Sequence, residues 1–360
     1  MQSGREQIDS LTGLRGVAAC WVVLMHFREI TPTRVWQFPI LDQIIANGAY
    51  GVDIFFVLSG FIMCHVYSRS FSADLRGEQV YRFMAYRLAR IYPVHVATFI
   101  LMLALFVARS ATTGESGLPY RYDPVTLLTT FTLTNAWVPG LQTPNMPAWS
   151  VSAEWFAYAL FPALCLFLSS HKWAPALYVV AGLGLAFFKP FGNDCLTHVL
   201  SGFLVGMATH RIMPRALWIA KGRFAGLGIS TAIACWAQVA DPSVEFGLLL
   251  FAALILALTN PRDLLSRFLS VTATVYLGEI SYSIYMVHWP VRAIIRNCLQ
   301  MLRLLDSLPS PFFVIISLLA TLIVAMASYR YVELPGRALL RRAAAVMEKA
   351  RGVSAAVPLE

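Results

Sequence analysis

Seven ionisable side chains that can bind anions or exchange protons lie in or beside apolar segments of this chain. Two of them, Arg15 and His26, belong to one stretch, LTGLRGVAACWVVLMHF, with ten mostly apolar residues between them. In an α-helix this spacing returns to nearly the same face, after a rise of ~16 Å. We therefore expect Arg15 and His26 to lie on one stripe of a helix, three turns apart. Such a stripe would offer a guanidinium to an anion at one end and an imidazole for proton transfer at the other.

Two further arginines predict a binding site for an anion. Arg87 and Arg90 stand at i and i+3 in YRLARIYP, so they share one helical face, and Pro93 is expected to bend or reset that helix. Together with Arg15 they resemble a cradle for an anionic, phosphorylated ligand. The alternative is that Arg87 and Arg90 only anchor a helix end by reaching lipid phosphates.

Three more groups are expected near the depth of His26. They are Asp53 in GVDIFFVLSGF, Glu154 in PAWSVSAEWF and His288 in YLGEISYSIYMVHWP. Ionisable groups inside a membrane are costly and usually mark function. Each also has a structural alternative, because Asp53 can cap a helix and the other two can be interfacial residues. Depth alone leaves open whether the four groups face one another.

The composition indicates that lipid is the solvent for the elements that carry these residues. Of the 360 residues, 58% are hydrophobic and 13% are charged, and the mean hydropathy is +0.64. We expect an all-α, polytopic membrane bundle. The net charge is +9, and the basic residues that produce it lie between the apolar segments. This placement is typical of membrane topology, so no nucleic-acid partner is expected.

Apolar segments predict about ten transmembrane helices, near residues 12–29, 48–67, 84–108, 150–169, 173–189, 194–210, 223–240, 244–260, 271–295 and 311–332. The Thr-rich segment 125–137 is too short to span and is interpreted as interfacial or re-entrant. With this count, 16 lysines and arginines lie on the side of the termini and seven on the other. The positive-inside rule then predicts that both termini are cytoplasmic.

The expected division is a membrane domain over residues 1–340 and a basic cytoplasmic tail over 341–360, with a short helix and a disordered end. The six cysteines have no CxxC spacing, and no metal site is expected. The other five histidines are interpreted as structural or loop residues, namely His65, His95, His171, His198 and His210.

Six segments together resemble the signatures of the integral membrane acyltransferase-3 family. In chain order they are LTGLRGVAACWVVLMHF, GVDIFFVLSGFIM, YRLARIYP, WSVSAEWFAY, SYSIYMVHWP and YRYVELPGR. The family includes bacterial acetylases of O-antigen, exopolysaccharides and Nod factors, and glucan succinyltransferases. Some members carry an additional extracytoplasmic hydrolase-like domain, for which we expect this chain to be too short.

The resemblance implies a ten-helix enzyme of the bacterial inner membrane that takes an acyl group from acyl-CoA. Acetyl-CoA is the expected donor and succinyl the second choice; the acceptor is a saccharide or lipid-linked saccharide that the sequence does not identify. The resemblance also implies two functional pairs of residues: Arg15 with His26, and Arg87 with Arg90. We expect the arginines to bind the donor's phosphates and His26 to act as general base or transient acyl carrier.

The remaining proton-exchanging groups have supporting roles in this hypothesis. Asp53 or Glu154 would orient His26, as the third member of a catalytic triad does, and His288 would belong to the same catalytic group. Two other functions fit buried charge in membrane helices. One is a transporter of a lipid-linked or anionic substrate, although no paired Gly- or Pro-broken segments are present; the other is a catalytically silent scaffold.

Overall fold

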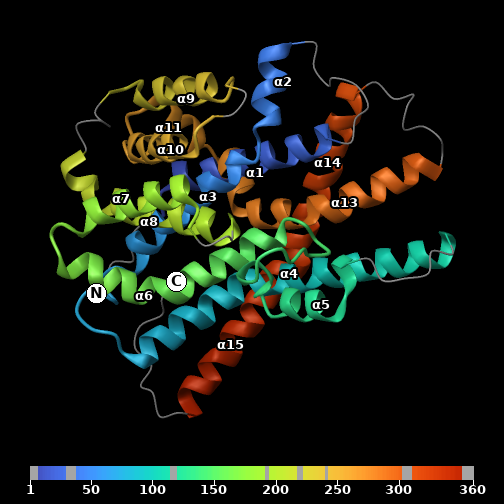
Figure 1. The fold of residues 1–360 in the computed structure, drawn as a ribbon, viewed down its shortest axis with the longest axis horizontal. Helices are drawn as coiled ribbons and strands as arrows, with labels where there is room; N and C mark the ends of the chain where they lie inside the picture. Colours follow the sequence, from blue (N-terminus) through green and yellow to red (C-terminus); the bar gives the residue numbers. More distant parts are fainter. Residues whose placement is uncertain are drawn as a thin grey trace.

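Every regular element is helical in the part of the chain that the structure, a computed structural model, describes: residues 7–29, 38–113, 120–190, 194–216, 222–239, 242–301 and 310–350. The all-α prediction is confirmed there. Figure 1 shows the arrangement of these helices. In chain order they are α1 (Asp9–Arg28), α2 (Pro39–Ala46), α3 (Tyr50–Tyr67), α4 (Gly77–Thr113), η1 (Tyr120–Tyr122), α5 (Pro124–Phe131), η2 (Asn135–Trp137), α6 (Ala148–Ser170), α7 (Ala174–Phe188), α8 (Asp194–Ala216), α9 (Ala225–Trp236), α10 (Val244–Leu258), α11 (Leu264–Leu269), α12 (Thr272–Glu279), α13 (Ser281–Met301), α14 (Ser310–Ser328), η4 (Tyr329–Glu333) and α15 (Leu334–Ala350).

Five helices in the described ranges are long and apolar enough to cross a membrane. They are α1, α3, α4, α6 and the helix that runs from α14 through η4 into α15. Three shorter helices, α7, α9 and α10, are also apolar, and each coincides with a segment expected to span. The count of about ten spans and the cytoplasmic side of both termini stay predictions.

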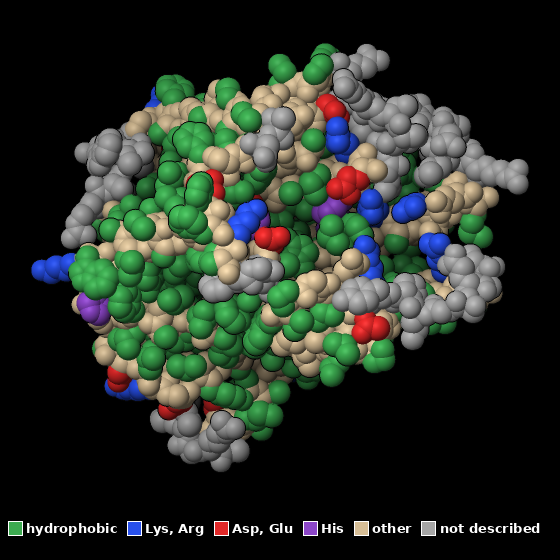
Figure 2. Space-filling model, in the orientation of Figure 1, with side chains coloured by type: hydrophobic (Ala, Val, Ile, Leu, Met, Phe, Trp, Pro, Cys, Tyr) green, Lys and Arg blue, Asp and Glu red, His purple; other side chains and the backbone are tan. Residues whose placement is uncertain are grey.

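The face of the molecule drawn in the space-filling view of Figure 2 is rich in exposed apolar side chains. Val107, Val180, Phe187, Phe188 and Ile323 are each more than half exposed. Such large apolar areas are unfavourable in water but are the normal surface of a helix that faces lipid tails.

The expected span over residues 271–295 consists of two helices. α12 ends at Glu279 and α13 begins at Ser281. α12 lies so close to α1 that a Cβ on Gly278 would come 1.8 Å from the carbonyl oxygen of Thr12. α13 is a separate helix, and it carries His288 and one wall of the pocket described below.

The Thr-rich segment 125–137 does not form a spanning helix. It contains all but the first residue of the eight-residue helix α5, followed by the short turn η2. The carboxylate of Asp123 caps α5 by accepting two backbone N–H groups of its first turn. Ser152 on α6 holds η2, because its hydroxyl accepts from the N–H of Ala136 and donates to the carbonyl of Leu133. The segment therefore packs against α4 and α6.

The C-terminal helix α15 packs along α4. The Arg341 guanidinium lies 5.3 Å from the ring centroid of Tyr86, and Arg82 lies 3.4 Å from a carboxylate oxygen of Glu348. The domain boundary expected after residue 340 falls inside this helix and stays a prediction. The end of the expected tail, residues 351–360, lies outside the described residues.

Candidate active site

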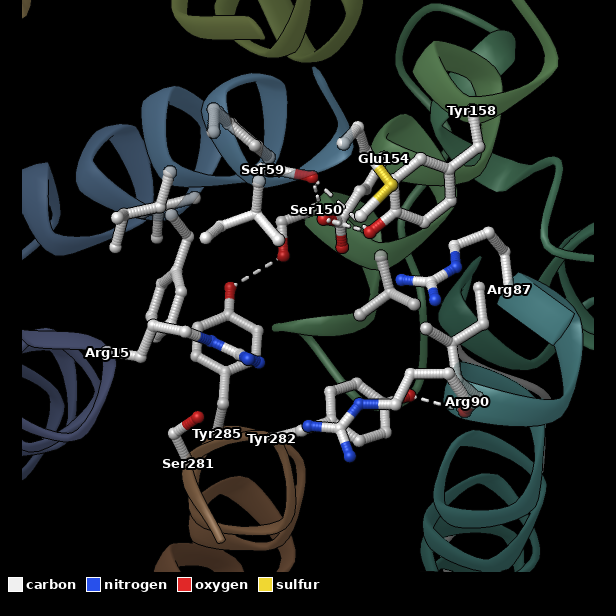
Figure 3. A pocket seen from close by; sticks show the side chains of 18 residues that line it. Arg15, Ser59, Arg87, Arg90, Ser150, Glu154, Tyr158, Ser281, Tyr282 and Tyr285 are labelled. Carbon is white, nitrogen blue, oxygen red and sulfur yellow. Dashed lines mark hydrogen bonds between the residues drawn. The ribbon is translucent and has the colours of Figure 1, made fainter. Parts of the chain in front are cut away.

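A pocket with a cavity volume of about 120 Å³ lies between α1, α3, α4, α6 and α13. Its polar lining is shown in Figure 3 and consists of Arg15, Ser59, Arg87, Arg90, Ser150, Glu154, Tyr158, Ser281, Tyr282 and Tyr285. The lining comes from five helices that are far apart in the sequence, so only the packing of the bundle creates it.

The three arginines expected to act together meet in this pocket. Arg15 comes from α1, whereas Arg87 and Arg90 stand one turn apart on α4, and all three guanidiniums point into the same space (Figure 3). The α4 helix continues through Pro93 instead of ending there. The structure thus brings the three expected arginines together along one pocket, and their role in binding a ligand stays a prediction.

The three guanidiniums differ in their protein partners. Arg90 Nη1 lies 2.7 Å from Oε1 of Glu333. Arg87 Nη2 donates to the hydroxyl of Tyr67 at 2.7 Å. Within the described ranges, Arg15 forms no hydrogen bond or ion pair. Arg15 and Arg87 therefore form no ion pair with a carboxylate in the described ranges, and guanidiniums in such a position recognise phosphate or carboxylate.

Glu154 lies at this arginine end of the site. Its Oε1 accepts hydrogen bonds from the hydroxyls of Ser59 and Tyr158, each at 2.6 Å. The pocket lining thus carries three guanidiniums and one carboxylate. This balance favours an anionic ligand.

His26 and His288 form a buried pair. Nε2 of His288 lies 3.1 Å from Nδ1 of His26, and the two rings stack with centroids 5.0 Å apart. His26 is 5% exposed and His288 is fully buried. The edge of Trp289 packs against His26, and Arg292 donates to the backbone carbonyl of His26 at 2.9 Å.

The hydrogen bonds of this pair determine which ring nitrogens carry protons. Nδ1 of His288 lies 2.6 Å from the carbonyl oxygen of Tyr285, which can only accept, so this nitrogen is the donor. In a neutral ring, Nε2 of His288 is then the acceptor, and Nδ1 of His26 must donate to it. The remaining nitrogen, Nε2 of His26, has no hydrogen-bond partner among the described residues. It therefore carries a free lone pair, as a general base requires.

Tyr285 connects the pocket to the histidine pair. Its hydroxyl lies in the pocket, 2.8 Å from Oγ of Ser150, and its backbone carbonyl binds His288. The rings of Tyr285 and His288 have centroids 5.9 Å apart. One side chain thus contacts both the space beside the arginines and the residue that orients His26.

Asp53, expected to act beside His26, pairs with a histidine of α8. Its Oδ1 lies 3.2 Å from Nδ1 of His198, a residue interpreted above as structural. Among the described residues, neither Asp53 nor Glu154 is hydrogen-bonded to His26. The expectation that a carboxylate orients His26 thus requires correction, because its partner is His288. No cluster of three or more His, Cys, Asp or Glu in the described ranges is placed to hold a metal ion.

Ser150 and Tyr285 were missed in the sequence, although helical spacing offers a signal for both. Ser150 precedes Glu154 by four residues on α6, and Tyr285 precedes His288 by three on α13. Residues at these separations share one helical face. A search for hydroxyl groups one turn from each expected acid or base would have found both.

Comparison with known proteins assigns this fold to a family. The model of the family described as "Acyltransferase domain", Acyl_transf_3, matches residues 8–330. Peptidoglycan O-acetyltransferase OatA of Listeria monocytogenes is 25% identical over 377 aligned positions, covering 92% of this chain and 56% of the relative. O-acetyltransferase OatA of Staphylococcus aureus is 24% identical, covering 96% and 60%. Acyltransferase MdmB of Streptomyces mycarofaciens is 28% identical, covering 79% of each chain.

This chain spans less than two thirds of the length of the OatA relatives. No solved structure matches it. The family match extends over the helices that build the arginine pocket and the histidine pair, and it decides between the enzyme and the transporter. The chain belongs to the acyltransferase-3 family: it is a multi-pass membrane acyltransferase related to the OatA O-acetyltransferases.

Proposed function

We propose that this enzyme moves an acetyl group from acetyl-CoA to a hydroxyl group of a cell-envelope or exported saccharide. The observation that carries the proposal is the order of groups along the site. Three arginines line one part of a pocket, and Tyr285 joins that pocket to the His26–His288 pair. An anionic donor and a proton acceptor are the two requirements of acyl transfer from a phosphorylated thioester.

Acetyl-CoA fits the arginine end because its phosphates complement the excess of positive charge there, three guanidiniums against one carboxylate in the lining. Arg15 and Arg87 have no carboxylate partner among the described residues, and Arg90 lines the same space. Arg15 and His26 lie on one helix, α1, with a rise of ~16 Å between them. A donor whose phosphates contact Arg15 can therefore extend its thioester along α1 toward His26.

The chemical step uses the lone pair on Nε2 of His26. The imidazole removes the proton from the acceptor hydroxyl while the oxygen attacks the thioester carbonyl. The tetrahedral intermediate collapses with cleavage of the C–S bond, and the imidazolium returns the proton to the departing CoA thiolate. His288 accepts the Nδ1 proton of His26 in a hydrogen bond throughout, which keeps the reacting nitrogen unprotonated at the start. Transient acylation of His26 is the alternative route.

The saccharide acceptor is inferred from the relatives. The Listeria relative is named a peptidoglycan O-acetyltransferase, which supports a sugar hydroxyl as acceptor; exopolysaccharide, lipopolysaccharide and glucan are the other candidates. Succinyl is the second choice of acyl group. We place the enzyme in the bacterial inner membrane with the arginine end facing the cytoplasm, because the excess of basic residues lies on that side.

The proposal is tested with purified protein in proteoliposomes, by measuring acceptor-dependent release of CoA from acetyl-CoA with saccharide acceptors. We expect His26→Ala to lower kcat by at least about 10²-fold, the usual contribution of a general base. The matched control is His171→Ala, because His171 lies at the end of α6 and contacts Phe167 and Trp173, outside the pocket lining. Full activity of His26→Ala would exclude His26 as the base, and an absence of CoA release in the wild type would exclude acetyl-CoA as donor.

A further inference from the structure

The carboxylate of Glu333 lies behind the pocket and contacts one of its arginines. Glu333 is fully buried, and its Oε1 lies 2.7 Å from Nη1 of Arg90. Its Oε2 accepts a hydrogen bond from the hydroxyl of Ser283 on α13 at 2.7 Å, and Arg337 on α15 lies 3.6 Å from Oε1. This one side chain therefore joins α4, α13 and α15.

A local change of helix geometry brings Glu333 to this position. Residues Tyr329–Glu333 form a π-helical turn between α14 and α15. A π-helical turn inserts a residue into an α-helix and so rotates the helix that follows by about 100°. One turn later, Gly336 packs directly against Pro93, where a Cβ would come 2.5 Å from the proline Cβ. α15 is thus fixed against the part of α4 that carries Arg90.

We infer that Glu333 is a positioning residue for the donor site: it holds the Arg90 guanidinium in the orientation that binds the donor phosphates. This inference rests on the proposed function. Glu333 does not line the pocket, so it acts through Arg90.

Two physical effects follow from this contact. An arginine side chain has many rotamers, and fixing it before the donor arrives reduces the entropy lost on binding. The carboxylate also offsets the repulsion between Arg90 and the guanidiniums of Arg15 and Arg87 in the same pocket. Arg15 and Arg87 then remain the two pocket arginines that form no ion pair in the described ranges.

The test is a double-mutant cycle on the full-length protein in proteoliposomes, with acetyl-CoA as the probe. We expect Glu333→Gln to raise the KM for acetyl-CoA about tenfold and to leave the KM for the saccharide acceptor unchanged, since a charge-assisted contact is lost. In an Arg90→Gln background, the same Glu333→Gln change should have no further effect on the KM for acetyl-CoA. Additive effects in the cycle would overturn the inference.

Glu348→Gln is the matched control, because the contact of Glu348 with Arg82 also joins α15 to α4 but lies outside the pocket. If Glu348→Gln raises the KM for acetyl-CoA as much as Glu333→Gln does, then only the packing of α15 against α4 affects donor binding. That result would also overturn the inference. If Glu333→Gln does not fold, Ser283→Ala replaces it in the cycle, with an expected rise of a few-fold.

The proposed function is checked separately, because Arg15→Gln must weaken acetyl-CoA binding whether or not Glu333 acts through Arg90. Unchanged acetyl-CoA binding in Arg15→Gln would contradict the proposed donor site itself. A normal Arg15→Gln result together with an unchanged donor KM in Glu333→Gln would overturn only the role of Glu333.

Discussion

The arginine end and the histidine end of the site are built on opposite electrostatic principles. Arg15, Arg87 and Arg90 bring three positive charges to one pocket, and within the described ranges only Arg90 has a carboxylate partner. The histidine end is a chain of neutral hydrogen bonds from the backbone carbonyl of Tyr285 through His288 to His26.

Under the proposed function, this difference assigns binding of the donor to the arginine end and proton transfer to the histidine end. Unneutralised guanidiniums attract an anion in the ground state and in the transition state alike, so their removal should mainly raise the donor KM. A hydrogen-bonded pair that leaves one lone pair free acts on a proton that moves only in the transition state, so its disruption should mainly lower kcat. The two ends are therefore distinguished by kinetics, and three substitutions test the distinction.

The largest effect is expected from His288→Ala. Without His288, Nδ1 of His26 loses its acceptor and the proton is free to occupy either ring nitrogen of His26. We expect kcat to fall by about 10²-fold with little change in the KM for acetyl-CoA. Steady-state kinetics of CoA release measures both. His288→Gln should recover part of the activity, because its side-chain oxygen can accept a hydrogen bond from His26. A raised donor KM with normal kcat in His288→Ala would contradict the assignment of proton transfer to the histidine end.

A smaller effect, confined to binding, is expected from Arg15→Gln. Loss of one charge-assisted contact should raise the KM for acetyl-CoA about tenfold and leave kcat within a few-fold of the wild type. Isothermal titration with acetyl-CoA checks the same change as a dissociation constant. Arg262→Gln removes an exposed arginine outside the pocket and should leave both values unchanged. A fall in kcat at constant KM would assign Arg15 to the chemical step.

The smallest effect is expected where the two ends meet. Tyr285→Phe removes the hydroxyl that contacts Ser150 but keeps the backbone carbonyl that orients His288. One neutral hydrogen bond is worth about 0.5–1.5 kcal/mol, so kcat should fall only about two- to tenfold. Ser150→Ala removes the same hydrogen bond from its other side. If both hydroxyls act through this bond, the turnover rates of Tyr285→Phe and Ser150→Ala, measured under saturating donor, should be similar. A loss as large as that of His288→Ala would show that the hydroxyl itself takes part in the reaction.

The sequence alone determined the features that arise from local spacing. The apolar run between Arg15 and His26 forms one uninterrupted helix, α1, and helical spacing placed Arg87 and Arg90 on one face of α4. Local periodicity was sufficient here because positions along a single helix follow from the rise and rotation per residue. The short, Thr-rich segment 125–137 was likewise recognised as unable to span, since length and composition decide that property.

Only the tertiary structure decided which helices face one another and so which side chains become partners. Asp53, Glu154 and His288 were expected at one depth with His26, yet they have three different sets of partners: His198 for Asp53, Ser59 and Tyr158 for Glu154, and His26 for His288. Depth along a helix is set by local sequence, whereas the rotation and neighbours of that helix depend on packing. Close contacts such as that of Gly278 with α1 fix this packing, and they involve residues more than 200 positions apart in the chain.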